Sequence, residues 1–295
     1  MSKEHPPHHV PVLKDSVLAY LKPQPGESYL DLTAGYGGHA SVILEETGFF
    51  TGSVLVDRDD YAIEHLSHLK DKGAHLMHTD FVTAATQLIE EGKAFDCILI
   101  DLGVSSPQLD QGERGFSFMH NGPLDMRMDR STGRTAADVI NESRPRELAL
   151  MIHEYGDEPF RQAERIAQAI VDGRPFKDTA ELAEAIAAQH RGKRSRIHPA
   201  TRTFQALRIA VNDELGQVKA ILPLLPQLLN KGGRVGVISF HSLEDRLVKR
   251  FFKEQTASGF EAELDILTKK PVSGATEDVH NPRSRSAQLR VAVKK

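Results

Sequence analysis

The clearest structural signal in the chain is Phe95-Asp-Cys-Ile-Leu-Ile-Asp101-Leu-Gly-Val-Ser105-Ser106-Pro107-Gln108. Its apolar first half is typical of a strand that is buried on both faces of a parallel sheet. Asp101 ends this run, and a turn of small hydroxyl residues and a proline follows. Because ligands of open α/β sheets bind outside the carboxyl ends of the strands, we expect this segment to present polar groups to a ligand.

A second strand end of this kind lies upstream, at Tyr29-Leu-Asp31-Leu-Thr-Ala-Gly35-Tyr-Gly37-Gly38-His39. A strand followed by glycines and a helix start exposes backbone N–H groups and allows a ligand to approach closely. Gly35, Gly37 and Ala40 fit the pattern G-x-G-x-x-A, and Asp57 ends the next expected strand 20 residues after Gly37. A carboxylate at about that spacing typically binds ribose hydroxyls. The segment therefore predicts a site for a nucleotide-like cofactor.

Two classes of cofactor fit this pattern, the dinucleotides and S-adenosylmethionine. Asp31 stands just before the glycines. A carboxylate gives no attraction to an anionic pyrophosphate, whereas it attracts the ammonium and sulfonium groups of S-adenosylmethionine. The charge of Asp31 thus favours S-adenosylmethionine. Phe81 follows the third expected strand, where it could pack on an adenine ring or serve as an ordinary core residue.

The turn after Asp101 offers groups suited to an amine substrate. An exocyclic amine needs hydrogen-bond acceptors that orient its lone pair and stabilise the positive charge that grows on nitrogen during methyl transfer. The catalytic candidates at this turn are Asp101, Ser105, Ser106 and Pro107. The alternative is a Ser-Ser-Pro turn that only ends a strand.

The pattern along the chain predicts an α/β fold with an insert. Apolar strands alternate with amphipathic helices up to Asp101, which indicates crossover connections and a parallel sheet. Residues 111–208 instead show an irregular loop and short helical patterns, two of which stop at Gly156 and Gly173. The alternation then resumes with a long helix over about 201–229, bent or interrupted at Pro223 and Pro226, and a strand over 234–240. Two late strands near 263–267 and 288–293 could form a hairpin. We therefore predict one domain formed by 1–110 and 209–295, with a helical insert of 111–208.

Composition excludes several classes of protein. The chain has 295 residues, of which 40% are hydrophobic and 26% charged, as expected for a globular protein with one domain and an insert, or with two domains. Cys97 is the single cysteine, so no disulfide forms within the chain and a reducing compartment fits. No run approaches the roughly 18 apolar residues of a membrane span. The first residues lack the apolar core of a secretory signal, so we expect a cytoplasmic protein. Neither histidines nor the cysteine are spaced as in a zinc site, and we expect no metal.

Positive charge is concentrated in two segments, although the net charge is −4. Residues 185–212 and 281–295 contain no Asp or Glu. Such segments attract polyanions, or they form a solvated face near scattered carboxylates. The RNA-binding candidates in the first segment are Arg191, Lys193, Arg194, Arg196 and Arg202.

Six motifs together resemble those of the MraW/RsmH family, the bacterial small-subunit rRNA cytosine-N4 methyltransferases. They are Asp31-Leu-Thr-Ala-Gly-Tyr-Gly-Gly-His39, Asp101-Leu-Gly-Val-Ser-Ser-Pro-Gln-Leu-Asp110, Arg114-Gly-Phe-Ser-Phe-Met119, Pro123-Leu-Asp-Met-Arg-Met-Asp129, His198-Pro-Ala-Thr-Arg-Thr-Phe-Gln-Ala206 and Ile238-Ser-Phe-His-Ser-Leu-Glu-Asp-Arg246. The resemblance runs from His9 to Ser286, which is nearly the whole chain.

This resemblance implies a Rossmann-like class I methyltransferase with a mostly parallel seven-stranded sheet. It also implies N4-methylation of a cytidine in the decoding region of 16S rRNA, with free rRNA or the small ribosomal subunit as partner. The family holds its S-adenosylmethionine at positions that match Gly37, Gly38, His39, Asp57, Phe81, Asp101 and Gln108. Asp101 would then serve the cofactor more than the target amine. Whether the protein forms a homodimer stays open.

Two other functions remain compatible with parts of the sequence. A nicotinamide-dependent oxidoreductase would explain the glycine pattern and Asp57, but it leaves Ser105–Gln108 and both basic segments unused. A non-catalytic RNA-binding module would explain the basic segments, but not the intact carboxylates Asp31, Asp57 and Asp101.

Overall fold

The computed structural model describes residues 10–190, 198–257 and 259–295. The chain divides into two compact units. Unit 1 comprises Met1–Gly103 and Gly216–Lys295, and unit 2 comprises Val104–Leu215. The insert expected at 111–208 falls within unit 2, which extends beyond it by seven residues at each end.

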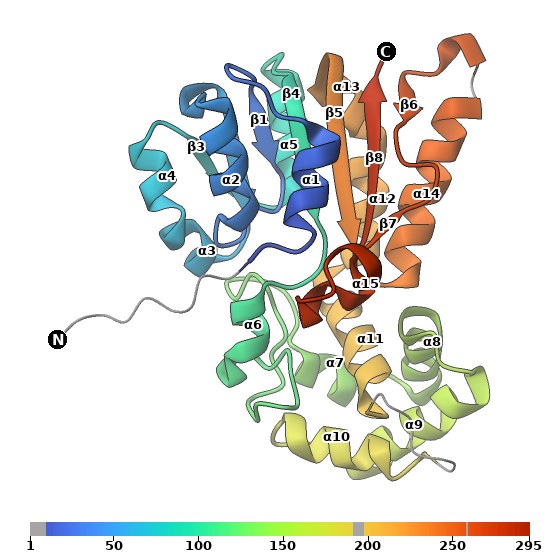
Figure 1. Cartoon of the computed structure of the whole chain (residues 1–295). Coiled ribbons are helices and arrows are strands. Elements are labelled where there is room, and N and C mark those ends of the chain that lie inside the picture. Colours follow the sequence, from blue (N-terminus) through green and yellow to red (C-terminus); the bar gives the residue numbers. More distant parts are fainter. Residues whose placement is uncertain (1–9, 191–197, 258) are drawn as a thin grey trace, which may run out of the picture. The chain divides into compact units, whose positions relative to one another are not determined.

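Unit 1 alternates strands and helices in the order that the apolar runs predict (Figure 1). Its first part contains α1 (Lys14–Leu21), β1 (Tyr29–Asp31), α2 (Gly38–Thr47), η1 (Phe50–Gly52), β2 (Val54–Asp57), α3 (Asp60–His65), α4 (Ser67–Asp71), β3 (His75–His78), α5 (Phe81–Glu90) and β4 (Phe95–Asp101). Its second part contains α12 (Glu214–Ile221), whose first two residues belong to unit 2. The elements that follow are η3 (Leu222–Leu224), α13 (Leu225–Leu228), β5 (Leu229–Ser239), α14 (Ser242–Ala257), η4 (Gly259–Glu261), β6 (Leu264–Ile266), β7 (Val272–Ser273), α15 (Gly274–Glu277), η5 (Pro282–Ser286) and β8 (Gln288–Lys294).

In the described ranges the sheet of unit 1 has eight strands, seven of them in the order β3-β2-β1-β4-β5-β8-β6. The first five are parallel to one another, and β8 runs antiparallel to β5 and β6. The expected mostly parallel sheet and the pairing of the two late strands are thus confirmed. The expected number of seven strands was one short, since β7 also pairs with β8. A strand of two residues has no periodicity from which it could be predicted.

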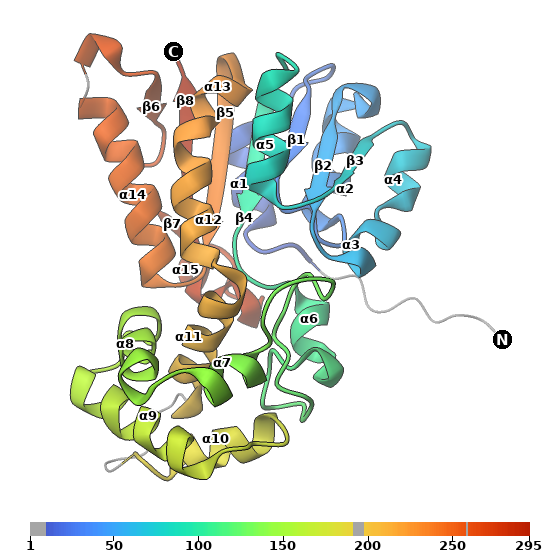
Figure 2. The same cartoon turned by 180° about the vertical axis from the view of Figure 1, so that it is seen from behind.

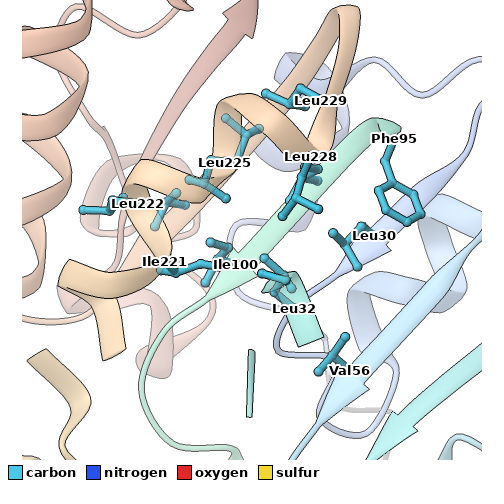
Figure 3. Close-up of a cluster of buried hydrophobic side chains, with 14 of the residues drawn as sticks. Leu30, Leu32, Val56, Phe95, Ile100, Ile221, Leu222, Leu225, Leu228 and Leu229 are labelled. Atoms are coloured by element: carbon cyan, nitrogen blue, oxygen red, sulfur yellow. The ribbon is translucent and has the colours of Figure 1, made fainter. Parts of the chain in front are cut away.

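Both faces of the sheet are buried, because successive side chains of a strand point to opposite faces. Leu30 and Ile100 belong to one hydrophobic cluster with residues of α5, α12, α13 and α14, which Figure 2 shows in front of the sheet. Leu99 and Leu55 belong to a second cluster with residues of α1, α2 and α4 on the other face. Figure 3 shows how Leu222 and Leu225 approach Ile100 in the first cluster. This double burial explains why the strands appear in the sequence as continuous apolar runs.

One ion pair anchors the end of α1 to the sheet. The Arg234 guanidinium on β5 donates to Glu27 Oε2 (2.6 Å) and to the Leu21 carbonyl (2.7 Å). The hydrogen bond from Arg234 is the main reason why the pKa of Glu27 is lowered. The sulfur of Cys97 lies 3.3 Å from Arg234 Nη2, yet burial raises the pKa of this thiol to about 12. Cys97 is fully buried, as the sequence predicts for a core residue.

Unit 2 is helical and has a hydrophobic core of its own. It contains α6 (Ser106–Asp110), η2 (Gly112–Arg114), α7 (Ala136–Glu142), α8 (Pro145–Gly156), α9 (Phe160–Gly173), α10 (Thr179–Ala187) and α11 (Ala200–Asn212). Helices α8 and α9 end at the expected residues, Gly156 and Gly173. The irregular segment before α7 is stabilised by an internal hydrogen-bond donor. The buried Arg114 donates to the carbonyls of Arg127 and Met128.

The long helix expected over 201–229 is broken into pieces. The interruption predicted at Pro223 is confirmed by the 3-10 turn η3. A second break was missed: Asp213 adopts a left-handed conformation (φ 47°) between α11 and α12. Asp tolerates this conformation better than most residues, but an Asp between two helical patterns is no stop signal by itself.

We predict that Leu225→Ala lowers the free energy of unfolding of unit 1 by about 2–5 kcal/mol, because it opens a cavity under the sheet. The Leu225 side chain is fully buried in the cluster of Figure 3. Urea unfolding followed by circular dichroism measures the change. Leu267→Ala is the matched control, since Leu267 is 43% exposed and its truncation should change stability by no more than about 0.5 kcal/mol. Equal effects of the two substitutions would contradict this account of the core.

Candidate active site

Three carboxylates end three neighbouring strands of unit 1. Asp31 ends β1, Asp57 ends β2 and Asp101 ends β4, and β1 lies between the other two strands. Since these strands are parallel, the three residues lie along one edge of the sheet. The sequence predicts the cofactor and the chemistry at this edge, and the structure brings these three residues together there.

The glycine turn between β1 and α2 is shaped by backbone conformations that favour glycine. Gly35 and Gly37 have φ values of 51° and 79°, and Gly37 is the N-cap residue of α2. A Cβ atom on Gly37 would also lie 3.0 Å from the side chain of Leu66. No side chain of the described residues caps this helix at Gly37, so the α2 N-terminus can offer backbone N–H groups to a ligand.

Asp57 is hydrogen-bonded to the glycine turn itself. Its Oδ2 accepts from the Gly35 N–H (2.8 Å), and its Oδ1 accepts from the Asp59 N–H (2.9 Å). Burial raises the pKa of Asp57, against the effect of these two hydrogen bonds. A carboxylate accepts about four hydrogen bonds, so Asp57 can hold the turn and still accept from a ribose hydroxyl.

Asp31 is buried and engaged by its own strand and turn. Its carboxylate accepts from the Tyr29 hydroxyl (2.7 Å) and from the Thr33 N–H (3.1 Å). Burial outweighs these hydrogen bonds and raises the pKa of Asp31 to about 7. The sequence predicts an electrostatic role for Asp31 toward a cation, and the hydrogen bond from Thr33 adds a role in fixing the turn.

Asp101 differs from the other two because one of its oxygens has no hydrogen-bond partner. Among the described residues, nothing donates to the buried Oδ1 of Asp101. Its Oδ2 lies 3.8 Å from His39 Nε2, and its backbone N–H donates to Thr33 Oγ1 (2.6 Å). Burial, together with the charges of Asp31 and Glu244, raises the pKa of Asp101 well above its usual value. An unsatisfied buried acceptor at a strand end suits a ligand that donates a hydrogen bond or carries positive charge.

Two further cofactor candidates lie on the helices of this edge. His39 is in the first turn of α2, and its side chain is only 9% exposed. Phe81 is the first residue of α5 and packs partly buried against the hydrophobic cluster of Figure 3. The structure thus supports a core role for Phe81 and leaves part of its side chain accessible.

The remaining candidates after Asp101 belong to unit 2. The Ser105 N–H donates to Gln108 Oε1 (2.9 Å), and Gln108 is 5% exposed. The side chains of Ser106 and Pro107, at the start of α6, lie outside the part that the structure describes. The side-chain amide of Gln108 thus closes this turn by accepting from Ser105.

Of the RNA-binding candidates, one lies within the described residues. Arg202 is half-exposed, and it donates to the Asp157 carbonyl (3.1 Å) and lies 3.8 Å from Glu158. The other candidates, Arg191, Lys193, Arg194 and Arg196, lie outside the described residues.

Glu244 was not singled out as a site residue, yet it organises the strand end next to Asp101. This buried carboxylate on α14 accepts from the backbone N–H groups of Phe240 (2.8 Å) and His241 (3.3 Å). Its Oε1 also lies 3.1 Å from His241 Nε2. An acid in the first turn of a helix that follows a strand was the available signal, but such an acid is also explained by the helix dipole alone.

We predict that Asp31→Asn removes part of the pH dependence of stability. The pKa of Asp31 rises from 3.8 to about 7 on folding, so its contribution to stability is fully present below pH 3.8 and is lost as the pH rises through 7. The variant should therefore gain stability relative to the unaltered protein at pH 8, by at most about 4 kcal/mol, and less at pH 5. Urea unfolding at both pH values tests this, and an equal effect of the substitution at pH 5 and pH 8 would refute it.

No described helix has both the length and the apolar character that a membrane span requires.

Comparison with known proteins relates nearly the whole chain to one family. The family described as "MraW methylase family" matches residues 7–295. Ribosomal RNA small subunit methyltransferase H of Synechocystis is 49% identical over 298 residues, which cover 97% of this chain and 93% of that protein. The proteins of the same name from Acidobacterium capsulatum and Crocosphaera subtropica are each 46% identical to this chain. The match with the first covers 97% of this chain and 98% of that protein, and the match with the second covers 100% of this chain and 92% of that protein. The chain belongs to the MraW methylase family.

Proposed function

We propose that this protein methylates the exocyclic N4 of a cytidine in the decoding region of small-subunit (16S) rRNA, with S-adenosylmethionine as the methyl donor. The observation that carries the proposal is the buried, unpartnered Oδ1 of Asp101 beside a glycine turn. Family membership and the name shared by the relatives, ribosomal RNA small subunit methyltransferase H, support the substrate. The rRNA substrate also favours a cytoplasmic location.

The residues at the sheet edge fit the proposed donor. Gly37, Gly38 and His39 would hold it through the N-terminus of α2, and Asp57 would accept from its ribose hydroxyls. Asp101 provides the acceptor that lacks a partner, and Phe81 and Gln108 complete the proposed set. When bound, S-adenosylmethionine supplies an electrophilic methyl group on a positively charged sulfur.

The turn after Asp101 is proposed to orient the target amine. Acceptors from Ser105, Ser106 and Pro107 would hold its N–H groups, so that the nitrogen lone pair points at the methyl carbon. As the N–C bond would form, the methyl–sulfur bond of the donor would break and leave a neutral thioether. The nitrogen would become positive, and its proton would then be acidic enough to leave. Preorganised acceptors stabilise this developing charge, so no strong base is needed beforehand.

Unit 2 is proposed to recognise the RNA. Arg191, Lys193, Arg194, Arg196 and Arg202 would contact the phosphate backbone, which positions the substrate without reading its sequence. Unit 2 has its own core and lies between the two halves of unit 1 in the sequence, as expected for an inserted recognition domain. A nicotinamide-dependent oxidoreductase would leave these basic residues unused, and family membership disfavours it.

We predict that cells lacking the protein lose one methyl group on a single cytidine of their small-subunit rRNA. Mass spectrometry of the digested rRNA locates the change, and nucleoside standards separate an N4-methyl from a C5-methyl or a 2′-O-methyl group. The purified protein should restore the methyl group with tritiated S-adenosylmethionine. If the deletion strain keeps every cytidine methylation of its small-subunit rRNA, the proposed function is refuted.

We predict that Asp57→Ala weakens binding of S-adenosylmethionine by about tenfold to one hundredfold. The substitution removes the Asp57 carboxylate, which would accept hydrogen bonds from the ribose hydroxyls of the donor. It also leaves the Gly35 N–H without its acceptor, which disturbs the glycine turn. Isothermal titration calorimetry measures the affinity. Asp60→Ala is the matched control, because Asp60 lies three residues away and its side chain is 74% exposed. Unaltered affinity in Asp57→Ala would remove Asp57 from the donor site.

A further inference from the structure

The cations of the basic C-terminal segment, 281–295, lie in two places, on η5 and on or after β8. The three on or after β8 contact groups of unit 1. Arg290 is buried and donates to Asp245 Oδ1 (2.7 Å), Lys294 donates to the carbonyls of Pro226 and Leu229, and Lys295 lies 3.5 Å from Asp265. The other two, Arg283 and Arg285, are exposed on η5.

Segment η5 lies at the same edge of the sheet as the donor-site carboxylates. It comes directly before β8, whose first residue, Gln288, pairs with Ser239 at the end of β5. The end of β5 is at the edge where β4 ends in Asp101, since Ile238 pairs with Asp101. Figure 1 shows α15, which contacts η5, at the arrowhead end of β5.

This arginine segment is firmly held by the remainder of unit 1. Asp278 accepts from the Leu13 N–H (2.9 Å) and from the hydroxyl of the buried Ser284. There is no space between η5 and α15, because a Cβ atom on Gly274 would lie 1.9 Å from the Ser284 carbonyl oxygen. Side chains on a backbone that is already ordered lose less entropy when they bind a partner.

The segment that holds η5 also contacts the glycine turn. Asn281 donates from its side chain to the Val10 carbonyl (3.3 Å), so residues 10–13 are attached at both ends to the residues just before η5, Asn281 and Asp278. The Pro11 ring lies against Gly38, whose hypothetical Cβ atom would be 3.0 Å from Pro11 Cγ. A short run of chain thus connects η5 with the proposed donor site inside one unit.

We propose that Arg283 and Arg285 bind phosphate groups of the RNA strand that carries the target cytidine. The inference rests on the proposed function and adds an RNA contact on unit 1 itself, outside the basic segment of unit 2. Guanidinium groups bind phosphates in a bidentate manner, which suits a positioning contact close to the reacting base.

The test compares two double variants of the full-length protein that each lose two positive charges. Arg283→Ala with Arg285→Ala removes the proposed contact. Lys231→Ala with Lys295→Ala is the matched control, because both lysines are exposed at the opposite edge of the sheet, where β5 begins and β8 ends. Methyl transfer is measured at several salt concentrations with the form of the substrate, free rRNA or purified small subunits, that the unaltered enzyme methylates.

The arginine variant should raise the KM for RNA by about tenfold or more at low salt, while kcat and the calorimetric affinity for S-adenosylmethionine stay unchanged. The dependence of log KM on log salt should become shallower by roughly 1.4, which is about 0.7 for each lost phosphate contact to a single strand. Arg283→Lys with Arg285→Lys should restore the salt dependence, since the charges remain.

Two results would overturn the inference while the proposed function stands. One is an RNA KM that is unchanged, or that rises equally in the lysine control. The other is a parallel loss of donor affinity, which would show that η5 acts only by supporting Pro11 and the glycine turn. If instead the unaltered enzyme transfers no methyl group to rRNA, the proposed function itself fails, and the assignment of η5 fails with it.

Discussion

The gathering of three carboxyl groups at one edge of a parallel sheet, with Asp31 buried and Asp57 and Asp101 partly buried, is the constraint on which the site depends. A buried carboxylate is costly unless hydrogen bonds satisfy it. Here the donors come from the turn that the ligand would contact: Gly35 donates to Asp57, and Thr33 donates to Asp31. The same Thr33 accepts from the backbone of Asp101. The glycine turn is therefore hydrogen-bonded to the strands on both of its sides, and its shape follows from the need to satisfy these acids.

This arrangement also explains why Asp101 stands apart. The acids on β1 and β2 are satisfied by nearby N–H and O–H groups, whereas one oxygen of Asp101 has no donor among the residues that the structure describes. The neighbouring charges of Asp31 and Glu244 add to the cost of ionising it. A cationic ligand would relieve both penalties at once. The edge is thus built to gain free energy from the kind of donor proposed for it.

Much of the fold could be predicted because its signals are local. Apolar runs that end in acids gave β1, β2 and β4, and glycines at helix ends gave the limits of α8 and α9. The positions of the glycine turn and of Asp57 followed from spacing. What could not be predicted depends on contacts between distant residues: Thr33 and Asp101 are 68 residues apart. The break at Asp213 and the role of Glu244 likewise depend on tertiary structure, which overrides weak local preferences.

The buried thiol of Cys97 has a practical consequence for studying the two units. Thiol reagents attack the thiolate form, and a fully buried cysteine with a pKa of about 12 provides almost none at neutral pH. If one cysteine were introduced on the surface of each unit, these two would therefore be the only reactive thiols for a maleimide fluorophore or spin label. The native chain can carry a pair of distance probes, one in each unit, without prior replacement of its own cysteine.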